Sequence, residues 1–297
     1  TARIARFCPN WKTARYGLDR LPPLRQGPKE NSCRLESGLP LRDTIRQASN
    51  SMSDSSDNLW HGLRPETAAI LETRDYSVSD LAGRLATTGI PAGNLINQEE
   101  KLSDVWIPGV KFLSRQVYQQ PHRGFFGEFS REGEGVLGEM GMWPKQWASA
   151  TMTGGSAKGF HIHPPFIPDG EEPAAWLRRL FLEEPTNFSL RQYDKEQWDA
   201  MFFVQGRLEM LLVDERAGME RRTMRFLIDG DNIPGPNNVG IVIPAGVAHA
   251  LRSADSSDLI MVYGTSTRFN PDFEGRIESR VEAAPLPSDW QGYFGSE

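Results

Sequence analysis

The chain has 297 residues, 38% of them hydrophobic and 24% charged, which suits one large domain or two small ones with a full hydrophobic core. No apolar run is long enough for a membrane-spanning helix. The net charge of −6 is uneven, because residues 1–51 carry ten Lys or Arg against four Asp or Glu. Their net +6 leaves −12 for the remainder, and an acidic body argues against a nucleic-acid-binding surface.

Residues 1–51 have neither a helical nor a strand period and are broken by prolines and glycines. We interpret them as a disordered leader or as non-native sequence upstream of a start at Met52, with an Arg-rich targeting peptide as the alternative. Both cysteines, Cys8 and Cys33, lie in this segment. The rest of the chain therefore has no disulfide framework, which suits a reducing cytoplasm.

Residues 52–105 are predicted to be a helical flank without chemistry of its own. Pro65 followed by Glu66 is typical of the first turn of a helix. Residues 77–80 offer an N-cap for a second helix, which the glycine and proline of residues 89–91 would end.

From residue 106 to 297 the pattern changes to short β runs separated by Gly and Pro turns, which is typical of a β-sandwich or barrel. The predicted strands are residues 110–118, 124–129, 147–153, 159–163, 201–205, 207–213, 223–228, 240–243, 248–252 and 259–263. One helical segment, residues 171–182, interrupts them and is expected to form a lid or rim insertion.

Two histidine segments predict where the chemistry lies. His161 and His163 are two residues apart in a β run, so their side chains share one face of a strand. His249 follows Pro244 and Gly246 in a P-x-G-x-x-H turn. This combination predicts a mainly β protein, a double-stranded β-helix (cupin or jelly-roll barrel) with N-terminal helices, one inserted helix and an ionisable interior.

Four segments, in order, resemble the motifs of the dTDP-4-dehydrorhamnose 3,5-epimerase family. Residues 122–129, HRGFFGEF, resemble its D-x-R-G-x-F-x-E-x-F block, and residues 158–161, KGFH, resemble its R-G-L-H block. Residues 203–216 are similar to its V-x-G-x-x-x-D-V-x-V-D-x-R strand pair. Residues 243–249 are similar to its I-P-x-G-F-A-H-G turn. The resemblance covers about residues 110–275.

The resemblance implies an isomerase that inverts a 4-keto sugar nucleotide at C3 and C5, without a cofactor and as a homodimer. Such chemistry needs a base, a proton donor on the opposite face and a group that stabilises the enolate. The resemblance makes His161 the base and Tyr263 the opposing acid. It also implies substrate-binding residues, which we assign as Arg123, Glu128, Lys158 and Gln146.

Two departures from the family leave the exact reaction open. The lysine that stabilises the enolate, seven residues before the glycine matching Gly206, is replaced here by Asp199. We include Asp199 among the catalytic residues, although its charge would repel a developing enolate. The aspartate that orients the family's histidine has only a weak counterpart, Asp289.

These departures fit an alternative, a metal-dependent cupin enzyme such as a dioxygenase or isomerase. Its ligands would be His161, His163, Asp199 and His249, a set that suits Fe, Mn, Ni or Zn. A divalent ion would also replace the missing lysine as enolate stabiliser. A third hypothesis is a non-catalytic sugar-binding cupin that kept the pocket.

Overall fold

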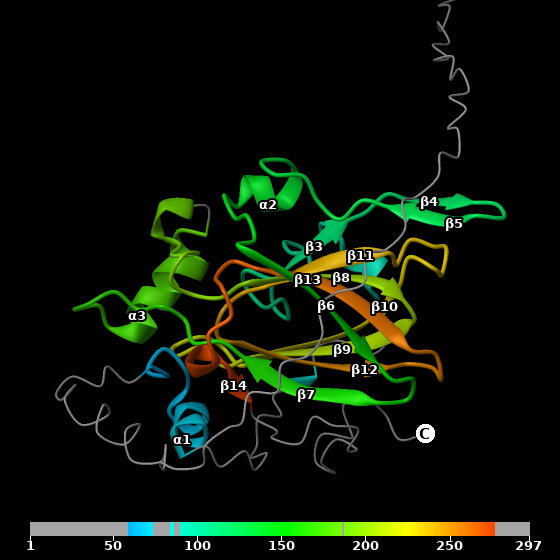
Figure 1. Cartoon of the computed structure of the whole chain (residues 1–297). Helices are drawn as coiled ribbons and strands as arrows, with labels where there is room; N and C mark the ends of the chain where they lie inside the picture. The colour runs from blue at the N-terminus through cyan, green and yellow to red at the C-terminus, as the bar shows by residue number, and fades with distance from the viewer. Residues whose placement is uncertain (1–58, 74–83, 86–89, 186, 277–297) are drawn as a thin grey trace, which may run out of the picture. The chain divides into compact units, whose positions relative to one another are not determined.

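Two β-sheets pack face to face in the computed structural model of the chain (Figure 1). The structure describes residues 59–73, 84–85, 90–185 and 187–276. The predicted leader, residues 1–51, and the tail residue Asp289 lie outside the described residues.

The larger sheet has the strand order β1-β10-β9-β12-β7-β14, and β2 also pairs with β10. Its strands are β1 (Arg84–Leu85), β2 (Ile90–Pro91), β7 (Ala157–Ile162), β9 (Arg207–Asp214), β10 (Arg222–Asp229), β12 (Val247–Ser253) and β14 (Gly275–Arg276). Neighbouring strands are antiparallel, except that β1 and β2 run parallel to β10.

The smaller sheet is antiparallel, with the order β3-β11-β8-β13-β6. Its strands are β3 (Lys111–Ser114), β6 (Gln146–Met152), β8 (Asp199–Gln205), β11 (Val239–Ile243) and β13 (Leu259–Thr265). A separate hairpin of β4 (Val117–Gln120) and β5 (Gly124–Gly127) projects beside this sheet (Figure 1). Every predicted strand segment overlaps an observed strand.

The path of the chain between the sheets defines the fold class. From β6 to β14 successive strands alternate between the smaller and the larger sheet, apart from the β9–β10 hairpin, which stays in the larger one. This repeated crossing winds the chain around one interior, as in a double-stranded β-helix. The predicted cupin-type fold is confirmed.

The inner strands of both sheets are buried on both faces. Between them, Phe203 and Met261 of the smaller sheet pack with Met210 and Phe226 of the larger one. Strands covered on both sides read as continuous apolar runs rather than alternating ones, which is why β8, β9 and β11 stand out in the sequence.

Short helices cover the outer faces. Helix α1 (Pro65–Thr73) packs Leu71 into a cluster with Phe160 on the back of the larger sheet. Helices α2 (Gly135–Glu139) and α3 (Pro173–Arg178) pack into a cluster with Phe202 on the back of the smaller sheet. A π-helix, Arg179–Glu183, continues α3, so the predicted insertion between β7 and β8 is confirmed.

The predicted second helix is wrong at Arg84–Leu85, which form a strand. Ile90–Pro91, which were expected to end that helix, form another strand. Both pair with β10, whose edge would otherwise present unpaired backbone groups. Most of the proposed helix falls outside the described residues. Three single-turn 3-10 helices complete the elements: Ala92–Leu95, Phe188–Leu190 and Pro271–Phe273.

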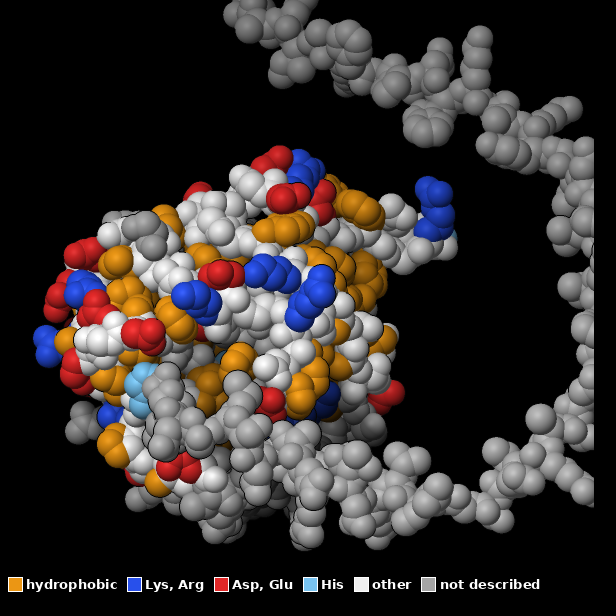
Figure 2. All heavy atoms as spheres, turned by 60° about the vertical axis from the view of Figure 1, so that its left-hand side comes forward, with side chains coloured by type: hydrophobic (Ala, Val, Ile, Leu, Met, Phe, Trp, Pro, Cys, Tyr) orange, Lys and Arg blue, Asp and Glu red, His pale blue; other side chains and the backbone are white. Residues whose placement is uncertain are grey.

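The described residues contain no helix that is long and apolar enough to cross a membrane. On the face drawn in Figure 2, acidic and basic side chains are interspersed among apolar ones. Charges of opposite sign that alternate in this way partly cancel, so they build no extended field of one sign over that face.

Candidate active site

Strand β7 directs its polar side chains into the space between the sheets. Phe160 and Ile162 face outward into the cluster with α1, whereas His161 and, directly after the strand, His163 face inward, as the two-residue spacing predicts. Opposite β12, four residues of β7 (158–161) span the length of three residues of β12 (249–251). This bulge places Lys158 on the same inner face as His161.

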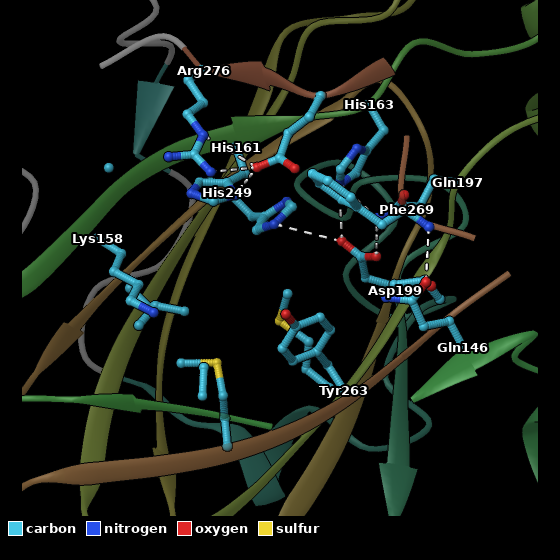
Figure 3. A pocket seen from close by; sticks show the side chains of 17 residues that line it. Gln146, Lys158, His161, His163, Gln197, Asp199, His249, Tyr263, Phe269 and Arg276 are labelled. Atoms are coloured by element: carbon cyan, nitrogen blue, oxygen red, sulfur yellow. Dashed lines mark hydrogen bonds and ion pairs between the residues drawn. The ribbon is translucent and has the colours of Figure 1, made fainter. Parts of the chain in front are cut away.

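The inner face lines a cavity of about 280 Å³ between the two sheets. Larger-sheet residues at its wall include Lys158, His161 and His249, and smaller-sheet residues include Gln146, Asp199 and Tyr263. Figure 3 shows these side chains converging from both sheets. A cavity of this size accommodates a monosaccharide, with any larger substituent extending beyond it.

His161 is held by an acidic side chain that the sequence analysis did not identify. Its Nδ1 lies 3.4 Å from Glu274 Oε1, and Glu274 also accepts hydrogen bonds from Arg276 Nε at 3.2 Å and Nη2 at 2.8 Å. The Nε2 of His161 is buried and has no hydrogen-bond partner among the described residues. An imidazole oriented through Nδ1 with a free Nε2 has the arrangement of a general base.

A second group of side chains gathers around Asp199, the first residue of β8. Asp199 Oδ2 lies 3.2 Å from His163 Nε2 and 3.7 Å from His249 Nε2. Gln197 Nε2 donates to Asp199 Oδ1 at 2.9 Å and lies 3.1 Å from His163 Nε2. All of these except Gln197 are at most 8% exposed. Three of the four predicted metal ligands therefore converge, while His161 turns to Glu274.

The histidines titrate differently because their surroundings differ. Burial, followed by the nearby His249 and Arg276, holds the pKa of His161 well below its usual value. Burial also lowers the pKa of His249, against the opposing effect of Asp199. For His163 the burial effect is outweighed by the charge and hydrogen bond of Asp199, so its pKa is raised.

The other ionisable groups of the cavity are shifted as well. Burial alone would raise the pKa of Asp199, but His163 and then His249 outweigh it and lower that pKa to about 2. Burial raises the pKa of Tyr263, with help from Asp199 and Glu274, so the phenol stays protonated at neutral pH. Burial and the neighbouring Arg276 lower the pKa of Lys158.

The turn before β12 fixes the position of His249. Gly246 has φ +79°, and a Cβ at this residue would lie 2.4 Å from Arg216 Cγ. Only glycine fits such a position, since the backbone is left-handed and the space is filled. The predicted P-x-G-x-x-H turn thus places its histidine at the cavity wall for a steric reason.

Two predicted substrate-binding residues do not reach this cavity. Arg123 is an exposed residue next to β5 in the projecting hairpin. Glu128 follows the same hairpin and pairs with Arg131 at 2.9 Å. In contrast, Lys158 and Gln146 both line the cavity, and Gln146 Oε1 accepts a hydrogen bond from the backbone N–H of Phe269.

Three contributors to the site were missed in the sequence. Gln197 precedes Asp199 by two residues, and a polar side chain at that spacing was a usable signal. Glu274 directly precedes β14 and Arg276 is its second residue. A strand of two residues gives no periodic signal in the sequence. Only its pairing with β7 at Ile162 and His161 brings them to the cavity.

Strand order and site together define a cupin-type barrel with an ionisable cavity between its sheets. No family model matches the chain. A curated protein, the spore coat polysaccharide biosynthesis protein SpsL of Bacillus subtilis, is 26% identical over 170 residues, which are 56% of this chain and 84% of SpsL.

Solved structures similar to the chain include proteins named as epimerases and isomerases of dTDP sugars. A double mutant of the 3'-monoepimerase ChmJ from Streptomyces bikiniensis is 19% identical, with a TM-score of 0.41, over 57% of this chain and 68% of ChmJ. RmlC from Legionella pneumophila is 16% identical, with a TM-score of 0.40, over 56% and 71%. A dTDP sugar isomerase from Desulfovibrio desulfuricans is 10% identical, with a TM-score of 0.43, over 64% and 93%.

Proposed function

We propose that this chain is an epimerase or isomerase that moves a proton next to the keto group of a nucleotide-linked 4-keto sugar. The observation that carries the proposal is the His161–Glu274 pair, which faces Tyr263 across a cavity of monosaccharide size. An epimerisation through an enolate needs a base and an acid on opposite faces of the ring, and two groups on opposing sheets meet that need.

His161 is the proposed base. A hydrogen next to the ketone leaves carbon as a proton to Nε2, and the electron pair moves into the enolate. The carboxylate of Glu274 lies 3.4 Å from Nδ1, where its charge stabilises the imidazolium that forms. Arg276, hydrogen-bonded to Glu274, fixes the carboxylate in turn.

Tyr263 is the proposed acid. Its hydroxyl delivers a proton to the opposite face of the same carbon, the enolate returns to the ketone, and the configuration is inverted. Exchange with water then restores the proton of the phenol and removes that of the imidazolium, so no redox cofactor is consumed. The enolate oxygen needs a positive partner during this sequence.

Lys158 and Gln146 are the proposed substrate-binding residues at the wall. Lys158 has no ion-pair partner within the described part of the chain, so its ammonium is available to a phosphate oxygen. SpsL supports the substrate class, because its name places it in polysaccharide biosynthesis.

A homodimer in the cytoplasm is part of the proposal. The β4–β5 hairpin carries Tyr118 and Phe126, which are each 55% exposed and stack with their ring centroids 6.4 Å apart. An apolar pair on a projecting hairpin is a surface that a second copy would cover. Replacing both by serine should convert dimer to monomer in light scattering, and a monomeric wild type would exclude the dimer.

Solvent deuterium exchange tests the proposed reaction. With a dTDP-linked 4-keto-6-deoxy sugar in D2O, we expect NMR to show deuterium at C3, at C5 or at both, and His161→Asn to abolish it. If the wild-type protein catalyses no exchange, the proposed epimerase activity is refuted and a sugar-binding function is favoured. Undiminished exchange in His161→Asn refutes the assignment of the base.

A further inference from the structure

We propose that His163, Asp199 and His249 form a binding site for one divalent transition-metal ion, with His161 left outside it as the base. The ligand atoms of these three residues all lie within 4.8 Å of one another. Two imidazoles and a carboxylate are a ligand set that Fe(II), Mn(II), Co(II), Ni(II) and Zn(II) accept.

The distances match ligands that share an ion. Atoms bound about 2.1 Å from one metal lie about 3.0–3.4 Å apart at octahedral or tetrahedral angles. Asp199 Oδ2 lies 3.2 Å from His163 Nε2 and 3.7 Å from His249 Nε2. Both distances lie within a few tenths of an ångström of that range, and all three ligand atoms lie within 4.8 Å of one another.

The hydrogen bonds on the far side of each imidazole give the second argument. His163 Nδ1 lies 3.4 Å from the carbonyl oxygen of Phe273, and His249 Nδ1 lies 3.4 Å from that of Val247. A carbonyl oxygen only accepts, so each Nδ1 carries a proton and each neutral ring directs the Nε2 lone pair forward. Metal-binding histidines are held in this way.

The two Nε2 atoms face the same oxygen, Asp199 Oδ2. That oxygen is also only an acceptor, so while both rings are neutral it receives a hydrogen bond from neither Nε2. One extra proton on His163 satisfies one contact and leaves the other, whereas a divalent cation between the three atoms satisfies both. Gln197, which donates to Asp199 Oδ1, keeps Oδ2 turned toward the imidazoles.

The ion would supply a positive partner for the enolate oxygen at Asp199, whereas Lys158 is assigned to the phosphate. Asp199 stands at the position where the related enzymes are expected to have a cationic lysine, and its charge opposes an enolate. An ion bound by Asp199 reverses that sign and supplies a Lewis acid beside the base. This role at the keto oxygen rests on the proposed function, whereas occupancy of the site does not.

Metal analysis of protein prepared without a His tag tests the site. The protein is stripped with EDTA, loaded separately with Zn2+, Mn2+ or Co2+, passed through gel filtration and analysed by mass spectrometry for metal content. We expect about one ion per chain. Asp199→Asn, of equal size, should bind more than about 100-fold more weakly, and Gln197→Leu about 10- to 100-fold more weakly.

His122→Asn is the matched control. It removes an exposed imidazole outside the cavity, and asparagine tolerates the left-handed backbone at φ +65°. This variant should bind like the wild type. Cobalt absorption bands and a metal-induced rise in Tm, both present in His122→Asn and absent in Asp199→Asn, distinguish a lost ligand from a misfolded chain.

The outcomes separate this inference from the proposed reaction. A wild type that retains none of the three ions, or an Asp199→Asn variant with wild-type affinity, overturns the site. One bound ion without deuterium exchange supports the site and refutes the epimerase. Equal exchange rates in stripped and loaded protein refute the role of the ion at the keto oxygen.

Discussion

The carboxylate behind the proposed base gives the sharpest mutational prediction. Glu274→Gln preserves the size of the side chain and removes the charge that lies 3.4 Å from His161 Nδ1. The lost interaction matters most when His161 becomes positive in the transition state. A hydrogen bond to a charged group contributes about 1.5–3 kcal/mol, so kcat should fall about 10- to 150-fold.

The substrate does not touch Glu274 in this account, so KM should change little. Initial rates of epimer formation over a range of substrate concentrations separate the two parameters, and a melting curve checks the fold. Asp272→Asn is the control, since it removes an exposed carboxylate two residues away. Equal kcat values for Glu274→Gln and the wild type would contradict the orienting role, as would a loss confined to KM.

Three further predictions concern Tyr263 and Lys158 in the cavity and Gly246 in the turn before β12. Tyr263→Phe should keep solvent exchange at carbon but slow inversion about 10²- to 10⁴-fold, and equal losses of both would refute its role as the opposing acid. Lys158→Gln should raise KM about tenfold with kcat nearly unchanged; an unchanged KM would remove it from substrate binding. Gly246→Ala should lower the free energy of unfolding in urea by about 2–4 kcal/mol, through backbone strain and contact with Arg216. Gly235→Ala, which meets nothing within 4 Å, should change it by less than about 0.5 kcal/mol.

The sequence predicts the barrel well because its strands are long enough to carry a pattern. The run of β11 is apolar over its whole length, and β8 and β9 contain apolar runs at residues 200–204 and 210–213, since both faces of these strands are covered. Strands β1, β2 and β14 have two residues each and form only because a neighbouring strand offers an edge. No local signal in two residues can reveal such a partner.

The site divides along similar lines. His161 and His163 were predicted from their spacing, because the pleat of a strand fixes which residues share a face. Asp199 was predicted from its position seven residues before Gly206, and His249 from the P-x-G-x-x-H turn. The sequence did not predict that His161 would pair with a carboxylate while the other three residues form a separate group. That division depends on Glu274, which lies near the C-terminal end of the described residues. The roles of all these residues stay predictions.

Arg123 and Glu128, in contrast, were predicted to bind the substrate but do not line the cavity. Their motif is local and was found, yet the hairpin that contains it projects beside the smaller sheet (Figure 1). The exposed position of both side chains follows from the direction of that hairpin. A motif match fixes residue types, whereas the path of the backbone decides which cavity they meet.

A crystal structure of the His161→Asn variant with a 4-keto sugar nucleotide bound tests the central claim most directly. We predict that C3 or C5 of the sugar lies about 3–3.5 Å from the position of His161 Nε2 in the native protein. The hydroxyl of Tyr263 should approach the same carbon from the opposite face. A sugar bound outside the cavity, or one with both groups on a single face of the ring, would contradict proton transfer between them.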